Sequence, residues 1–294
     1  MEKRIDFRDQ ISKNKRKSFF LMMIVFIVLV FLGYIISFLF EPGYFFVIMV
    51  ISIIFSIGYI LVSYYKSDKI AIASVGAKKA SYDRHKEYYH LVEGLTLASG
   101  MPMPRLYIME SPQINAFASG RDPKNAVVCV TTGALEKLEK RELEGVLAHE
   151  LGHIATCDMR YMTLVAVMVG MIAIISEIFL RSLWFKGGSN DNNKGNAIFM
   201  LIGIIFAILA PIVVQLVQFS ISRKREFVAD ASAVKFTRYP VGLISALKKI
   251  KQDSGVETRK VSKAVAPLFF ASPFRNMTST HPPLEKRIEV LERM

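Results

Sequence analysis

The chain has 294 residues, of which 52% are hydrophobic, and its positive mean hydropathy argues against an ordinary soluble fold. Its net charge of +13 is compatible with nucleic-acid binding, but the sequence has no RNA- or DNA-binding motif, so we expect no nucleic-acid partner. The two cysteines, Cys129 and Cys157, predict no disulfide in a reducing compartment.

Two long apolar runs near the start of the chain predict a transmembrane hairpin. Residues 19–40 and 44–65 contain no charged side chain, and each run is about 33 Å long as a helix, enough to cross a hydrocarbon core of about 30 Å. Only the short turn Glu41-Pro42-Gly43 separates them. A cleavable signal peptide is disfavoured, because its apolar region is about 7 to 15 residues long.

Lysine and arginine residues flank this hairpin on both sides, whereas its turn carries none. They are Lys3, Arg4, Arg8, Lys13, Lys15, Arg16 and Lys17 before the first run, and Lys66, Lys69, Lys78 and Lys79 after the second. Because cations favour the cytoplasmic side, we expect residues 1–18 to form a basic cytoplasmic N-terminus. Residues 66–160, which follow the hairpin, should then also be cytoplasmic.

Three short segments in this region predict a small sheet. Residues 105–109, 116–119 and 126–130 are strand-like and bounded by Pro, Gly or Asp. An edge strand in such a sheet can pair with the backbone of an extended substrate. An edge strand without that role is the alternative.

The run His149-Glu150-Leu151-Gly152-His153 is typical of a zinc metalloprotease. On a helix, His149 and His153 lie about 6 Å apart along one face, so both rings can reach one metal ion. Glu150 can take the proton of the attacking water. Residues 134–158 have no proline and carry apolar side chains at three- and four-residue steps, which predicts one amphipathic helix. Gly152 should sit where a side chain would crowd a second helix or the ion.

Two further apolar runs, at residues 161–180 and 197–221, predict a second transmembrane pair. They are less uniform, because Glu177 interrupts the first and Pro211 the second. Membrane helices tolerate such residues where neighbouring helices or a wet cavity satisfy them. Long apolar helices buried within the catalytic fold are the alternative.

A catalytic zinc ion has three protein ligands, so one remains to be found after the two histidines. Glu226 is the best candidate, and Asp230 follows it by one helical turn. Asp230 can then accept the ring proton of a liganding histidine and fix its orientation. A solvated acidic helix face is the alternative. Cys157 could extend the ligand face by one turn, but a small buried residue is the stronger interpretation.

Together these residues resemble the HtpX-type integral-membrane zinc metalloproteases, which are related to the type I CAAX prenyl endoproteases. The likeness covers nearly the whole chain. It rests on the paired spans, Gly100-Met101-Pro102-Met103-Pro104, Asn115-Ala116-Phe117-Ala118, Thr131-Thr132-Gly133, the histidine motif, Arg225-Glu226 through Ala229-Asp230, and Thr280-His281-Pro282-Pro283. The resemblance implies that His149, His153 and Glu226 are zinc ligands and that Glu150 is the catalytic carboxylate. It also implies membrane-protein quality control under stress, with the active site facing the cytoplasm.

The resemblance suggests roles for three further residues. A similar Asn-Ala-aromatic strand lies over the cleft of gluzincin proteases, so Asn115 and Ala116 are expected to contact substrate. His281 is expected to stabilise the oxyanion of the tetrahedral intermediate. A surface or packing residue is the alternative for this histidine. A helix after Pro283 should bury Leu284, Ile288 and Leu291 and anchor the loop that carries His281.

The sequence therefore predicts a mainly α, multi-pass protein of the cell membrane with a cytoplasmic α+β zincin-like (gluzincin) domain and a small sheet. Residues 66–160 and 222–294 should form the two parts of that domain, separated by residues 161–221. We expect one Zn²⁺ per chain and protein substrates that are themselves misfolded or misassembled membrane proteins, reached beside the lipid bilayer. A CAAX-type processing protease and a non-catalytic membrane scaffold that retains a zinc site are the alternative functions.

Overall fold

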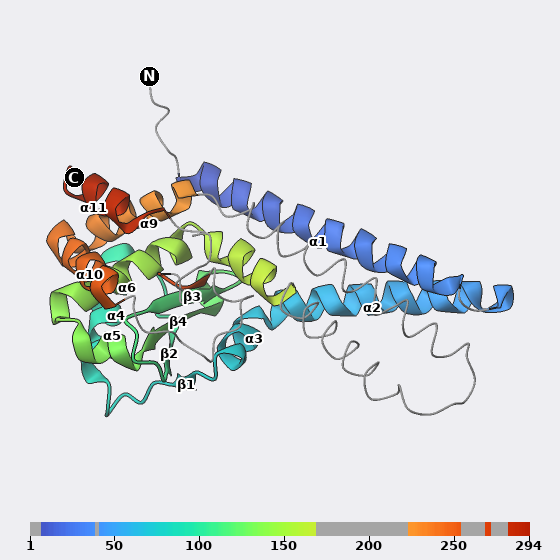
Figure 1. Ribbon diagram of the computed structural model, residues 1–294, viewed down its shortest axis with the longest axis horizontal. Helices are drawn as coiled ribbons and strands as arrows, with labels where there is room; N and C mark the ends of the chain where they lie inside the picture. Colours follow the sequence, from blue (N-terminus) through green and yellow to red (C-terminus); the bar gives the residue numbers. More distant parts are fainter. Residues whose placement is uncertain (1–6, 39–40, 169–222, 254–267, 272–281) are drawn as a thin grey trace, which may run out of the picture.

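The computed structural model describes residues 7–38, 41–168, 223–253, 268–271 and 282–294 (Figure 1). His281 lies outside the described residues. So does most of the predicted second transmembrane pair, of which only residues 161–168 are described, within a helical stretch at 158–168.

Two long helices project from the rest of the molecule as a hairpin (Figure 1). They are α1 (Phe7–Ser37) and α2 (Phe45–Tyr65), joined through the 3-10 turn η1 (Pro42–Tyr44). Both are long and apolar enough to cross a membrane, and most of their side chains face outward. The helix α1 begins at Phe7, so the basic segment before residue 19 continues the helix of the first span.

Both helices of the hairpin also contact the part of the molecule that carries the histidine motif. Asn14 of α1 donates a hydrogen bond from Nδ2 to the carbonyl of Thr156 at 3.2 Å, and Tyr59 of α2 donates one to the carbonyl of Met168 at 2.8 Å. The hairpin is therefore fixed to the neighbourhood of the candidate site.

A four-stranded mixed sheet forms the floor of the site. Its strands are β1 (Lys78–Lys79), β2 (Arg105–Met109), β3 (Ala116–Gly120) and β4 (Ala126–Thr131), in the order β1-β2-β4-β3. The β2 and β4 strands are parallel, and the other two pairings are antiparallel. Three strands lie where the sequence predicts them, with β3 at the edge. The two-residue β1 is too short to leave a pattern in the sequence.

The predicted single helix over residues 134–158 is wrong in its extent. The chain forms two helices here, α5 (Thr132–Lys137) and α6 (Lys140–Ala155). The break at Leu138 and Glu139 has a local cause. The Glu139 side chain accepts a hydrogen bond from the backbone N–H of Glu142, and the Glu142 side chain accepts one from the backbone N–H of Glu139. This reciprocal pair is a capping box, which starts a new helix.

Further helices lie near α6, packed either against it or against its helical neighbours (Figure 1). They include α4 (Lys86–Ser99), α9 (Arg223–Thr237), α10 (Pro240–Asp253) and α11 (Leu284–Leu291), while α3 (Ser67–Ser74) follows the hairpin. Two glycines let neighbours approach α6 closely. A Cβ on Gly152 would lie 3.1 Å from Ala229 Cα of α9, and one on Gly145 would lie 2.7 Å from Leu243 N of α10. Gly152 therefore faces a second helix, one of the two positions expected for it.

Candidate metal centre

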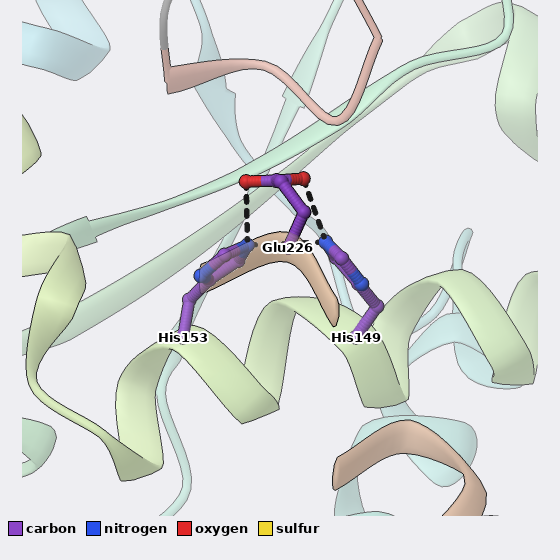
Figure 2. Close-up of side chains that lie close together, drawn as sticks. All are labelled: His149, His153 and Glu226. Carbon is purple, nitrogen blue, oxygen red and sulfur yellow. Dashed lines mark hydrogen bonds and ion pairs between the residues drawn. The ribbon is translucent and has the colours of Figure 1, made fainter. Parts of the chain in front are cut away.

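Two helices bring three candidate ligands together (Figure 2). The α6 helix carries His149 and His153 one turn apart, and α9 carries Glu226 above them. The two Nε2 atoms lie 3.0 Å apart, and the Glu226 oxygens lie 3.7 Å from His149 Nε2 and 3.8 Å from His153 Nε2. One candidate ligand atom from each residue falls within 4.8 Å of the others.

A carboxylate holds the far nitrogen of each imidazole. His149 Nδ1 lies 2.8 Å from Asp230 Oδ1, and His153 Nδ1 lies 3.0 Å from Asp158 Oδ1. A carboxylate accepts, so each Nδ1 carries a proton, and when both rings are neutral each turns an Nε2 lone pair toward the other. Two lone pairs and a carboxylate converging on one point repel each other unless a cation lies between them. The donor set therefore fits a metal ion.

The pKa values of the two histidines are shifted in opposite directions. Burial lowers the pKa of His149 to about 4, and the charge of Arg287 adds to this effect. Burial also works to lower the pKa of His153, but the carboxylates of Asp158, Glu226 and Glu150 outweigh it and raise this pKa to about 9. Without a metal, a proton on His153 Nε2 can bridge to His149 Nε2 and relieve the repulsion.

Asp230 is in turn held by a fully buried arginine from the C-terminal helix. Arg287 Nε donates to Asp230 Oδ2 at 2.9 Å, and its Nη2 donates to Oδ1 at 2.7 Å. Burial alone would raise the pKa of Asp230, but Arg287 and His149 hold it below its ordinary value. Asp230 is therefore ionised and can accept the ring proton of His149. The same arginine lies 3.6 Å from Glu226, through Nη1 and Oε2.

Glu150 is buried beside the candidate ligands. Burial raises its pKa to about 7, and although His153 opposes this rise, Glu226 adds to it. Among the described residues, its Oε1 has no hydrogen-bond partner. A carboxylate with a pKa near 7 is well suited to take and return a proton at neutral pH. Glu150, His153 and Glu226 line a cavity of about 20 Å³, and Leu268, Phe269 and Phe270 line it as well.

The predicted substrate-contact residues lie at the edge of the sheet. Asn115 and Ala116 are both buried, and they contact the described segment at residues 268–271. Cys157 is buried just beyond α6 with a positive φ of 54°, outside the ligand cluster. Its backbone turn brings Asp158 back toward His153.

Sequence reasoning missed two residues that contact the histidines or their partner. Asp158 follows His153 by five residues and gives no periodic signal in the sequence. Arg287 could have been found, because it shares the predicted buried face of α11 with Leu284, Ile288 and Leu291. An arginine on such a face requires an ionised partner.

A helix that carries the His-Glu-x-x-His pattern, completed by a carboxylate from a second helix, defines the class of metallopeptidases. The family model described as Peptidase family M48 matches residues 82–294. The chain belongs to peptidase family M48, among its HtpX proteases. It is therefore a metalloprotease that acts on protein substrates, and its apolar helices make it a membrane protein.

Three relatives named "Protease HtpX homolog" illustrate this membership. The one from Thermoanaerobacter pseudethanolicus is 41% identical over 291 residues, which is 96% of this chain and 95% of the relative. The one from Caldanaerobacter subterraneus is 40% identical, with coverage of 96% and 95%, and the one from Tropheryma whipplei is 42% identical, with coverage of 81% and 82%. A solved structure, described as "Crystal Structure of S. mikatae Ste24p", is also similar to this chain. The match covers 96% of this chain and 66% of the Ste24p chain, with a TM-score of 0.46 and 18% sequence identity.

Proposed function

We propose that the chain holds one zinc ion through His149, His153 and Glu226 and uses it to hydrolyse peptide bonds in a gluzincin-like active site. The observation that carries this proposal is the approach of three candidate ligand atoms to within 4.8 Å, with Glu150 lining the same cavity. Two histidines and one glutamate are a donor set of catalytic zinc sites, which keep a fourth position open. A bound zinc ion supplies a Lewis acid that polarises the scissile carbonyl and acidifies water.

The protein's own residues would perform the proton transfers and the positioning. Glu150 takes the proton of the attacking water and passes it to the leaving amine, in keeping with its pKa of about 7. Asp230, fixed by Arg287, orients the His149 ring. Asn115 and Ala116 hold the substrate backbone along β3, and His281 stabilises the oxyanion.

The enzyme would reside in the cytoplasmic membrane as a multi-pass protein, with its N-terminus and active site on the cytoplasmic side. The lysines and arginines on both flanks of the hairpin support this orientation. The contact between Asn14 and Thr156 supports it too, because it joins the N-terminal end of α1 to the end of the histidine helix. Residues 66–160 and 222–294 form the catalytic domain, and residues 161–221 form the second membrane pair.

A site beside the bilayer favours substrates that are membrane proteins or their cytoplasmic loops. We therefore assign the enzyme to quality control of misfolded or misassembled membrane proteins under stress. The names of the relatives, which call them proteases, support the hydrolytic part of this assignment.

Two variants compared in detergent test the assigned roles. Glu150→Gln should retain about one zinc per chain and lose casein cleavage by at least a hundredfold, because it removes only the proton acceptor. Glu226→Ala should lose both zinc and cleavage. The exposed Glu87 of α4 provides the control Glu87→Gln, which should match the wild type in both measurements. Cleavage by Glu150→Gln at the wild-type rate, or full zinc retention by Glu226→Ala, would refute the corresponding role.

A further inference from the structure

The edge of β3 already carries a partner, a segment of the same chain at residues 268–271. Phe269 lies opposite Phe117 in an antiparallel bridge, and the Phe270 N–H donates to the carbonyl of Ala116 at 2.8 Å. The side chain of Asn115 completes the pairing, because its Nδ2 donates to the carbonyl of Ala271 at 2.8 Å while its Oδ1 accepts from the Ala271 N–H at 3.1 Å. The 268–271 segment is therefore bound through its backbone.

The same segment lines the space next to the candidate metal ligands. The ring of Phe270 lies 4.7 Å from the ring of His149, edge to face, and 4.5 Å from the guanidinium of Arg287. The remaining cavity, also lined by Glu150 and Glu226, has a volume of about 20 Å³. A space of this size holds about one water molecule. A peptide strand, which extends by about 3.3 Å for every residue, cannot enter while the segment is in place.

The side chains of the segment are buried in defined positions. Phe269 packs on Phe117 with 5.1 Å between ring centroids, and both Phe269 and Phe270 are only 1% exposed. Backbone pairing on an edge strand, combined with pockets for alternate side chains, is the way in which proteins bind extended peptides. The 268–271 segment thus makes the kinds of contact that a substrate would make.

We propose that the 268–271 segment is an internal occupant of the substrate position on β3, and that a peptide reaches the metal centre only after displacing it. This inference rests on the proposed function, since it takes β3 as the strand that holds the substrate. The apparent affinity for a peptide is then its intrinsic affinity multiplied by the fraction of molecules in which the segment has left. The occupant restrains hydrolysis until an extended, unfolded segment of a substrate competes for the strand.

A reversible covalent lock tests whether the segment must leave. Phe117 and Phe269 face each other across the bridge, so Phe117→Cys with Phe269→Cys places two thiols within reach of a disulfide. Cys129 lies opposite Phe117 on β4, so the lock is built in full-length protein that also carries Cys129→Ala and Cys157→Ser. Phe269→Cys alone, in the same background, is the matched control.

Hydrolysis of an internally quenched casein peptide is measured before and after reduction with a phosphine, and zinc content is measured in both states. We expect the disulfide form to show at least a tenfold lower kcat/KM than its own reduced form, at equal zinc content, and the control to be indifferent to reduction. A disulfide form that cleaves as fast as its reduced form overturns the inference. The proposed function fails by a different result, in which wild type and Glu150→Gln cleave this peptide equally.

Hydrogen exchange gives a second readout that does not depend on the lock. Full-length Glu150→Gln is saturated with the same casein peptide, and exchange is followed in fragments that cover residues 268–271. We expect amide exchange there to become at least tenfold faster, because the Phe270 and Ala271 N–H groups lose their acceptors on Asn115 and Ala116. Unchanged or slower exchange under saturation also overturns the inference.

Discussion

Asp158 and Asp230 hold the imidazoles of His153 and His149 from behind, each through the Nδ1 atom. Such carboxylates fix the tautomer and direction of a ligand, and their loss typically weakens metal binding 10- to 100-fold. We predict that Asp158→Asn lowers zinc affinity within that range, because an amide can present its NH₂ group where the histidine needs an acceptor. Competition with a chromophoric chelator measures the change.

Asp122 provides the control for this prediction. Its carboxylate accepts from the backbone of Asn125 in a surface turn, so Asp122→Asn should bind zinc like the wild type. Equal zinc affinity of Asp158→Asn and the wild type would contradict the orienting role of Asp158.

At this scale, the sequence predicts the residues whose spacing is set by a single helix. His149 and His153 follow from the turn of α6, and the pair Glu226 and Asp230 follows from that of α9. Asp158 depends instead on the positive φ of Cys157 just beyond the helix, and no pattern of side chains encodes that turn. The roles of these side chains stay predictions.

At the scale of elements, the contact between α6 and α9 sets the position of Glu226. A Cβ on Gly152 would meet Ser232 Cβ at 3.0 Å and the backbone of Ala229 at 3.1 Å. We predict that Gly152→Ala destabilises the protein by about 1–3 kcal/mol, because overpacking outweighs the gain in helix propensity. It should also weaken zinc binding by moving α9. Thermal unfolding in detergent and zinc titration measure the two effects.

Gly94 of α4 is the matched control, since a Cβ there would have no described residue within 4 Å. Gly94→Ala should therefore stabilise the protein by about 1 kcal/mol and leave zinc binding unchanged. A stabilised Gly152→Ala variant with normal zinc affinity would show that close packing at Gly152 does not position the site.

The start of α6 is tied to α10 by Glu142. Ser245 Oγ donates to Glu142 Oε1 at 2.5 Å and Lys249 Nζ donates to Oε2 at 2.6 Å. Burial works to raise the pKa of Glu142, but the hydrogen bonds from Lys249, Ser245 and the Glu139 backbone outweigh it and hold this pKa below its ordinary value. A depressed pKa stabilises the fold above the unfolded value of about 4.3, and this stabilisation is lost as pH falls through the folded value.

Glu142→Gln should therefore lower the free energy of unfolding by about 1–2 kcal/mol at pH 7, with the difference from wild type shrinking below about pH 4. Unfolding by denaturant at pH 7 and pH 3 tests this. Glu144→Gln, on the same helix with an exposed partner in Arg141, should change stability by less than about 0.5 kcal/mol at either pH. A difference for Glu142→Gln that is as large at pH 3 as at pH 7 would rule out an electrostatic origin.

Local patterns predict the elements well where the residues of one segment determine its secondary structure. The strands β2, β3 and β4 follow from β-favouring residues between breakers, and α11 follows from its apolar face. The break between α5 and α6 escapes such patterns because the capping box at Glu139 lies inside continuous apolar periodicity. The pairing of Phe269 with Phe117 escapes them too, since two residues so far apart in the chain meet only through the tertiary fold.

At the scale of the whole molecule, the hairpin is joined to the part that carries the metal centre by direct contacts and by the chain itself. The N-terminal end of α1 contacts the end of α6 through Asn14, and the C-terminal end of α2 leads into α3 and the sheet (Figure 1). Both ends of the hairpin therefore lie on the side of the catalytic residues, while the turn at Gly43 lies at the far end. We therefore expect the side of the bilayer that holds the metal centre to hold residues 7–18 as well.

This geometry makes the orientation testable with two single cysteines. Within the described part of the chain, a Cβ added at Gly43 would have nothing within 4 Å, and Leu97 on α4 is 80% exposed, so Gly43→Cys and Leu97→Cys should both be tolerated. Because the cations flank the hairpin and avoid its turn, we predict that a membrane-impermeant maleimide labels Gly43→Cys in intact cells. It should label Leu97→Cys only after permeabilisation.

The wild type is the control, since Cys129 and Cys157 are buried and should stay unlabelled in both conditions. Labelling of Leu97→Cys in intact cells would place the catalytic domain outside and reverse the proposed orientation.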